Sequence, residues 1–163
     1  MSIADSFLPE FDSEMASTRK VLSRVPADKW DWKPHAKSRS LGELATHVAE
    51  LPRWGMRMKG ESFQVGSEKP PSLRSADELV ARLDQNAAAA RESIAGMSES
   101  DLDGEFRVLK PDGAVFFALP RRAVPRRVLL NHLIHHRGQL TVYLRLLDVP
   151  LPTIYGPTAD ESI

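Results

Sequence analysis

The segment that decides the fold is RRVLLNHLIHHRGQLTVYLRLL, residues 126–147. Its apolar residues recur at steps of three and four, the spacing of a helix that turns one face toward a core. Two histidines belong to the same stripe. The full stripe consists of Leu129, His132, Leu133, His136, Leu140, Tyr143, Leu144 and Leu147. The sequence therefore predicts a helix with two histidines on its buried face.

His132 and His136 are four residues apart, so their side chains lie about 6 Å from each other on one face of this helix. Both can reach one small ligand, and a metal ion is the obvious candidate. The alternative is that each is an ordinary hydrogen-bonded core histidine. A buried imidazole without a partner costs about 1–3 kcal/mol, and one cation would serve both rings. Spacing alone leaves the two interpretations open.

The composition indicates an ordinary globular protein. We expect a single domain over residues 1–163. Because 22 basic residues balance 22 acidic ones, the net charge does not indicate a nucleic-acid partner. The absence of cysteine excludes thiolate nucleophiles and cysteine-ligated zinc sites. The N-terminal MSIADSFLPEFDSE lacks a signal-peptide pattern and no run of 18 apolar residues occurs, so we expect a cytoplasmic protein without a membrane partner.

Four helices are predicted, near residues 3–23, 41–59, 75–96 and 125–147. Ser40 with Glu43, and Ser75 with Glu78, form capping boxes that start the second and third. His47 lies in the apolar stripe of the second helix, and Pro52 should kink that helix one turn later. The remaining members of this stripe are Leu44, Leu51 and Trp54.

The connections between these helices are long. Residues 26–39 hold two prolines and two tryptophans and predict an ordered loop, in which His35 is an exposed loop histidine. Residues 98–125 contain PDG between two apolar runs, which indicates a hairpin or an irregular excursion with little regular sheet. After residue 147, three prolines and a glycine predict an extended surface tail, with Tyr155 as its anchor.

Together these elements predict an all-α, antiparallel four-helix bundle with an irregular excursion before the last helix. His47, His132 and His136 could then meet between the second and fourth helices. Three neutral nitrogens leave positions for water or substrate, as catalytic metal sites do. The chain lacks paired Glu-x-x-His motifs, which argues against a ferritin-like di-iron centre.

The chain resembles the DinB/YfiT-like superfamily of metal-binding four-helix bundles over nearly its full length. The resemblance is carried by LGELATHVAEL, by NHLIHHRGQLTVYLRLLDVPLP and by YGPTADE. It implies a divalent metal, with zinc or nickel as the leading candidates, bound by His47, His132 and His136. His135 points about 100° away from His136 on the helix, so it is not included in the predicted ligand set, and a different rotation of the helix that places His135 there instead of His136 is the alternative.

Two polar neighbours are candidates for orienting the ligands. Glu43 lies one turn before His47, although its capping role explains it equally well, and Tyr143 lies on the metal helix, although a core tyrosine is its default interpretation. The resemblance also implies a homodimer, and we expect three tryptophans and the prolines of the connections to leave apolar surface for the partner.

Two functions from different classes follow. The first, which the resemblance implies, is a metal-dependent enzyme of the thiol S-transferase or hydrolase type that acts on a small molecule, with a low-molecular-weight thiol as one candidate. The second is a non-catalytic metal-binding stress or interaction bundle. A solvent-reachable cavity of a few hundred Å³ that opens on the metal would favour the enzyme.

Overall fold

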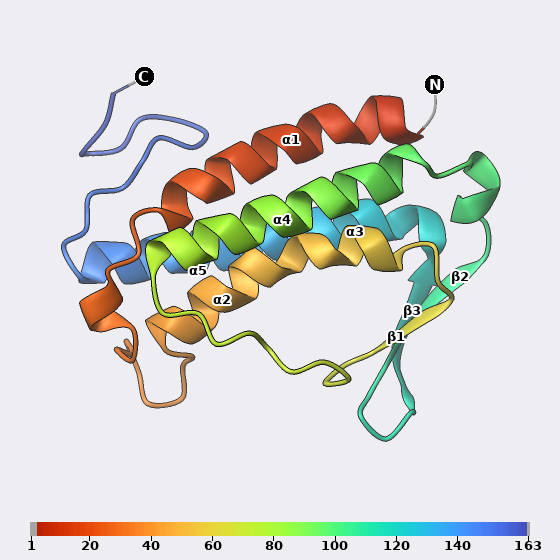
Figure 1. Ribbon diagram of the computed structural model, residues 1–163, viewed down its shortest axis with the longest axis horizontal. Coiled ribbons are helices and arrows are strands. Elements are labelled where there is room, and N and C mark those ends of the chain that lie inside the picture. Colours follow the sequence, from red (N-terminus) through yellow and green to blue (C-terminus); the bar gives the residue numbers. More distant parts are fainter. Residues whose placement is uncertain (1–2, 163) are drawn as a thin grey trace.

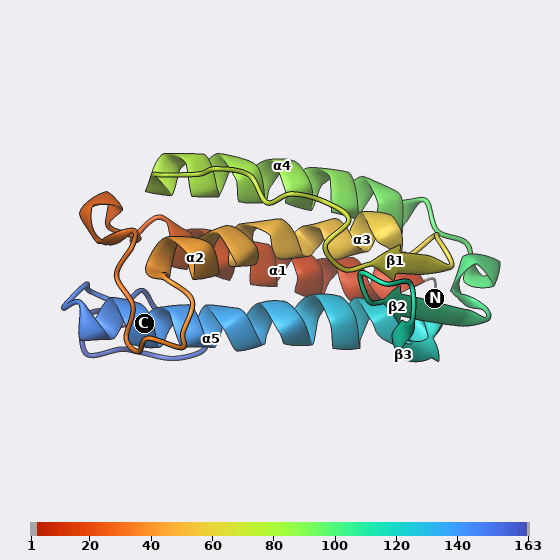
Figure 2. The same ribbon diagram turned by 90° about the horizontal axis from the view of Figure 1, so that it is seen from below.

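The computed structural model describes residues 3–162, in which four long helical segments pack side by side (Figure 1, Figure 2). These are α1 (Ile3–Leu22), α2 with its continuation α3 (Leu41–Glu50, Trp54–Arg57), α4 (Ala76–Ala95) and α5 (Asn131–Leu146). α1 runs antiparallel to α4, and α2 runs antiparallel to α5. α2 and α4 run in the same direction, because the connection between them returns along the length of the bundle (Figure 1). The all-α four-helix bundle predicted from the sequence is confirmed, and its antiparallel pairs are α1 with α4 and α2 with α5, whereas α2 and α4 are parallel.

Both predicted capping boxes are present. The Ser40 hydroxyl accepts from the backbone N–H of Glu43 at 3.2 Å, and the Glu43 carboxylate accepts from the backbone N–H of Ser40 at 2.7 Å. Ser75 and Glu78 make the same pair of bonds at the start of α4. These bonds satisfy backbone donors that the first turn of a helix leaves free. The starts of α2 and α4 are therefore fixed by local sequence.

The second helix is interrupted at the predicted proline. α2 ends at Glu50, residues Leu51–Arg53 form a 3₁₀ turn, and α3 follows. Pro52 has no N–H to donate to the preceding turn, which accounts for the break. Just beyond it, α3 packs closely on α4, since a Cβ placed on Gly55 would lie 2.7 Å from the Cβ of Ala90. The small side chains of the alanine run therefore permit a close approach of the two helices.

The excursion before the last helix contains a small sheet at one end of the bundle (Figure 2). Strands β2 (Glu105–Leu109) and β3 (Val115–Pro120) form an antiparallel hairpin, and β1 (Ser62–Gln64) pairs with β2 in parallel. The hairpin is one of the two alternatives predicted for this segment. The third strand was not expected, because its pairing joins segments more than 40 residues apart in sequence, at Ser62 and Arg107.

The last helical segment begins as a π-helix, Pro125–Leu130, and becomes α5 at Asn131. Shorter 3₁₀ turns lie at Ala27–Lys29, Glu99–Leu102 and Arg121–Ala123. The tail folds back over the end of α1, and the Tyr155 hydroxyl donates to the Glu14 carboxylate, whose oxygens lie at 2.8 and 2.9 Å. Tyr155 thus anchors the tail as expected. No helix within residues 3–162 has the length and apolarity needed to cross a bilayer.

Candidate metal centre

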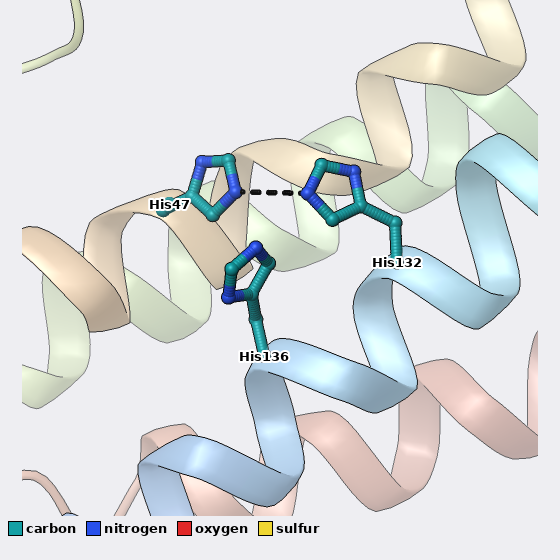
Figure 3. A group of neighbouring side chains, drawn as sticks. All are labelled: His47, His132 and His136. Atoms are coloured by element: carbon teal, nitrogen blue, oxygen red, sulfur yellow. Dashed lines mark hydrogen bonds between the residues drawn. The ribbon is translucent and has the colours of Figure 1, made fainter.

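Three imidazoles converge between α2 and α5 (Figure 3). His47 comes from α2, and His132 and His136 come from successive turns of α5. One ring nitrogen from each lies within 4.8 Å of the other two. Nε2 of His47 and Nε2 of His132 are 3.3 Å apart. The structure therefore brings together the three histidines that the sequence had singled out.

The spacing of these nitrogens fits a metal ion. Two nitrogens bound at about 2.0–2.1 Å to a tetrahedral zinc ion lie about 3.3 Å apart. The separation of the His47 and His132 nitrogens matches that value. Three nitrogens and no cysteine or carboxylate make up the group. The donor set is therefore suited to a transition metal such as zinc, nickel, iron or copper rather than to calcium or magnesium, which prefer oxygen.

The protonation of the rings also suits metal binding. Burial, together with the positive charge of Arg39 and the neighbouring imidazoles, lowers the pKa of His47 to about 3. Burial and the neighbouring histidines His136 and His135 lower the pKa of His132 to about 4. The pKa of His136 is lowered as well, mainly by burial. All three rings are thus neutral near pH 7, which is the form that binds a metal.

One neighbour orients a ring. Nδ1 of His136 lies 2.7 Å from Oε1 of Gln139, one turn further along α5. With Nδ1 donating to this oxygen, Nε2 is the nitrogen free for a metal, the arrangement commonly found around metal-bound histidine. Gln139 was not among the sequence-based candidates. The signal was its spacing of three residues from His136, which puts both side chains on adjacent turns of one helix.

The other candidates lie beside the group. His135 has its ring 4.8 Å from that of His136, centroid to centroid, but does not belong to the three-nitrogen cluster. Glu43 caps Ser40, and this backbone bond holds the pKa of its carboxyl below the usual value. The Tyr143 hydroxyl donates to the backbone carbonyl of Arg39 at 3.3 Å. Within residues 3–162, neither Glu43 nor Tyr143 hydrogen-bonds to the three imidazoles.

Two cavities adjoin the cluster. One, of about 590 Å³, reaches His47 and is lined by charged side chains of α2, α3 and the connection 66–74. The other, of about 620 Å³, reaches His132 and His135 and is lined mainly by apolar residues of the hairpin, among them Phe116, Phe117 and Leu119. Two of the three imidazoles, those of His47 and His132, therefore line cavities of a size that admits small molecules.

Comparison with known proteins agrees with this architecture. The sequence profile of the DinB family matches residues 1–162. This chain belongs to the DinB family. A curated Bacillus subtilis relative named uncharacterized protein YrdA is 24% identical over 161 residues, which cover 96% of this chain and 90% of that protein.

Crystal structures of DinB-like proteins share the fold. The Bacillus cereus protein superposes with a TM-score of 0.72 at 22% identity, covering 93% of this chain and 97% of its own. The YjoA protein of Bacillus subtilis gives a TM-score of 0.69 at 20% identity, covering 91% of this chain and 96% of its own. At this level of identity the similarity shows the fold alone, so function has to come from the site.

Proposed function

We propose that this DinB-family protein is a metal-dependent enzyme that acts on a small molecule, with His47, His132 and His136 as the ligands of one zinc or nickel ion. The cluster of neutral nitrogens and the tetrahedral spacing of two of them support the metal. Three protein ligands leave a position for water or substrate, whereas structural zinc sites use four. The proposed site is therefore of the open, catalytic type.

The observation that carries the enzymatic proposal is the cavity of about 590 Å³ that reaches His47. Its size is within the range of small-molecule sites, and charged and aromatic side chains line it. A bundle that only stored or sensed a metal would have no need of such access. The cavity favours turnover over the alternative of a non-catalytic metal-binding stress or interaction protein.

The chemistry we propose is thiol S-transfer or hydrolysis. When bound, the metal supplies Lewis acidity, which lowers the pKa of a coordinated thiol or water. The residues of the chain hold the rings in place: burial keeps His47 and His132 unprotonated, and Gln139 fixes the orientation of His136. Packing of α2 against α5 brings these three rings together.

The test is a screen of zinc-loaded and nickel-loaded protein against two substrate panels, one for thiol conjugation and one for ester and amide hydrolysis. We expect activity with at least one panel. His132→Ala should abolish it, whereas the exposed loop variant His35→Ala should retain it. Metal-loaded protein that is inactive on both panels would favour the non-catalytic alternative. Activity that survives His132→Ala would place the reaction elsewhere.

A further inference from the structure

Two cationic side chains that line the cavity beside His47, Arg39 and Lys69, make no ion pair within residues 3–162, and Arg39 is the one that adjoins α2. Four arginines line this cavity, and three of them pair with carboxylates: Arg53 with Glu50 at 2.8 Å, Arg57 with Glu68 at 2.7 Å, and Arg74 with Asp31 at 3.2 Å. The fourth, Arg39, makes no ion pair and no side-chain hydrogen bond within residues 3–162. Its exposed guanidinium is available to a ligand.

Arg39 is fixed between the two helices that carry the metal ligands. It directly precedes Ser40, the N-cap of α2, and its backbone carbonyl accepts a hydrogen bond from Tyr143 of α5. The positive charge of Arg39 acts on the site. Burial is the largest cause that lowers the pKa of His47, His132 and His136, and the charge of Arg39 is among the smaller causes. The backbone of Arg39 is therefore held beside the site, while its guanidinium lines the same cavity as His47.

The acidic groups of the same cavity are already engaged. Glu43 caps the Ser40 N–H, Glu50 binds Arg53, Arg82 and Asn86, and Glu68 binds Arg53 and Arg57. A divalent ion held by three neutral imidazoles keeps its full double charge, because no carboxylate belongs to the ligand set. Within the described residues no carboxylate forms an ion pair with Arg39 and none belongs to the proposed ligand set, so the metal position and Arg39 together form a cationic site.

We propose that Arg39 binds an oxyanion group of the substrate, a carboxylate in the simplest case, while another atom of the same molecule coordinates the metal. This inference rests on the proposed function and specifies its substrate class as small anions. The planar guanidinium suits the contact, since its donors form a fork that matches the two oxygens of a carboxylate. Arg39 is thus a substrate-binding residue that selects for negative charge.

The test uses cobalt-loaded protein and two small thiols, 3-mercaptopropionate with a carboxylate and 2-mercaptoethanol without one. Binding is followed by the absorption that a thiolate produces on cobalt. Each thiol is compared with itself in wild type and in Arg39→Gln, so that intrinsic differences between the thiols cancel. Arg39→Gln should weaken 3-mercaptopropionate about tenfold and 2-mercaptoethanol less than about twofold, as expected for loss of a charge-assisted hydrogen bond.

Arg74→Gln is the matched control, because Arg74 lines the same cavity but is paired with Asp31. It should change either affinity less than about twofold. An equal effect of Arg39→Gln on both thiols, or an effect of Arg74→Gln as large as that of Arg39→Gln, would overturn the inference. Cobalt stoichiometry separates the two proposals: wild type that takes up no cobalt refutes the metal site and the inference with it. Normal cobalt uptake with unchanged thiol affinities refutes the role of Arg39 alone.

Discussion

Burial and mutual proximity lower the pKa values of the three histidines, an effect that their spacing in the sequence could not predict. The pKa of His47 falls to about 3 and that of His132 to about 4, chiefly because burial penalises the charged ring. A free imidazole near pH 6.5 is half protonated, and protons then compete with a metal. In this fold the competition should begin only at lower pH, so metal binding should persist into mildly acidic solution.

The metal-free protein should lose stability as the pH falls below 6.5. The pKa values of His47 and His132 are lower in the folded chain than the ordinary value of 6.5, so between pH 6.5 and about 4 the unfolded chain binds more protons. The contribution of these two histidines to the free energy of unfolding is fully present above pH 6.5 and decreases as the pH falls through this window. Urea midpoints at about pH 7.5 and about pH 5 should differ less in the His47→Gln/His132→Gln variant than in wild type. An equal pH dependence in both proteins would contradict the burial of these rings.

A packing prediction concerns Gly42, which lies under the Trp30 indole. A Cβ at Gly42 would lie 2.0 Å from Nε1 of Trp30, so Gly42→Ala should destabilise the protein by about 1–3 kcal/mol through overpacking. Gly138 in α5 is the matched control, because a Cβ added there would meet nothing within 4 Å. Gly138→Ala should be neutral or stabilise by up to about 1 kcal/mol through helix propensity. Urea unfolding measures both, and a stable Gly42→Ala would show that the indole can move away.

At the scale of the elements, local signals predicted most of the bundle. The expected helices 3–23 and 75–96 agree with α1 and α4 to within a residue, because capping boxes and apolar stripes are local features. Pro52 marked the break between α2 and α3. The pairing of β1 with β2 and the π-helical start before α5 had no local signal.

The candidate site, like the fold, was predicted only in part from the sequence. The helical period placed His132 and His136 on one face, and the structure adds His47 to them as expected. The proposed role of Arg39 could not be predicted, because a loop residue is brought to the cavity beside His47 only by the tertiary fold. Glu43 was assigned two roles from sequence, and the capping role is the one its contacts show.

The tail is held by a buried ion pair that should be costly to break. Arg137 and Glu14 lie 2.7 Å apart with side-chain exposures of 2% and 8%, and Arg137 also donates to the Tyr155 hydroxyl. Arg137→Leu would leave the Glu14 carboxylate buried without its cation and should cost about 3–5 kcal/mol. The half-exposed pair Arg91–Asp12 is the control, and Arg91→Gln should be nearly neutral in the same denaturation assay. Equal effects of the two substitutions would contradict a special role for the buried pair.

At the scale of the whole molecule, the homodimer remains a prediction. Trp30 and Trp54 are buried in the core and offer no surface to a partner. Apolar surface is found instead on the hairpin and beside β1, where Val65, Val115 and Phe116 are 43%, 53% and 62% exposed. Light scattering should give about twice the chain mass of 18.2 kDa, and Phe116→Glu should lower it. A wild-type mass near 18.2 kDa at micromolar concentration would contradict the dimer.

The most direct test of the metal centre is the metal stoichiometry of the purified full chain after equilibration with Zn²⁺ and removal of unbound ion. Wild type should retain about one zinc per chain, and each of His47→Ala, His132→Ala and His136→Ala should retain far less, because two nitrogens hold zinc weakly. His135→Ala should keep its zinc, since its ring lies outside the cluster. Stoichiometric zinc in all three ligand variants would contradict the proposed metal centre.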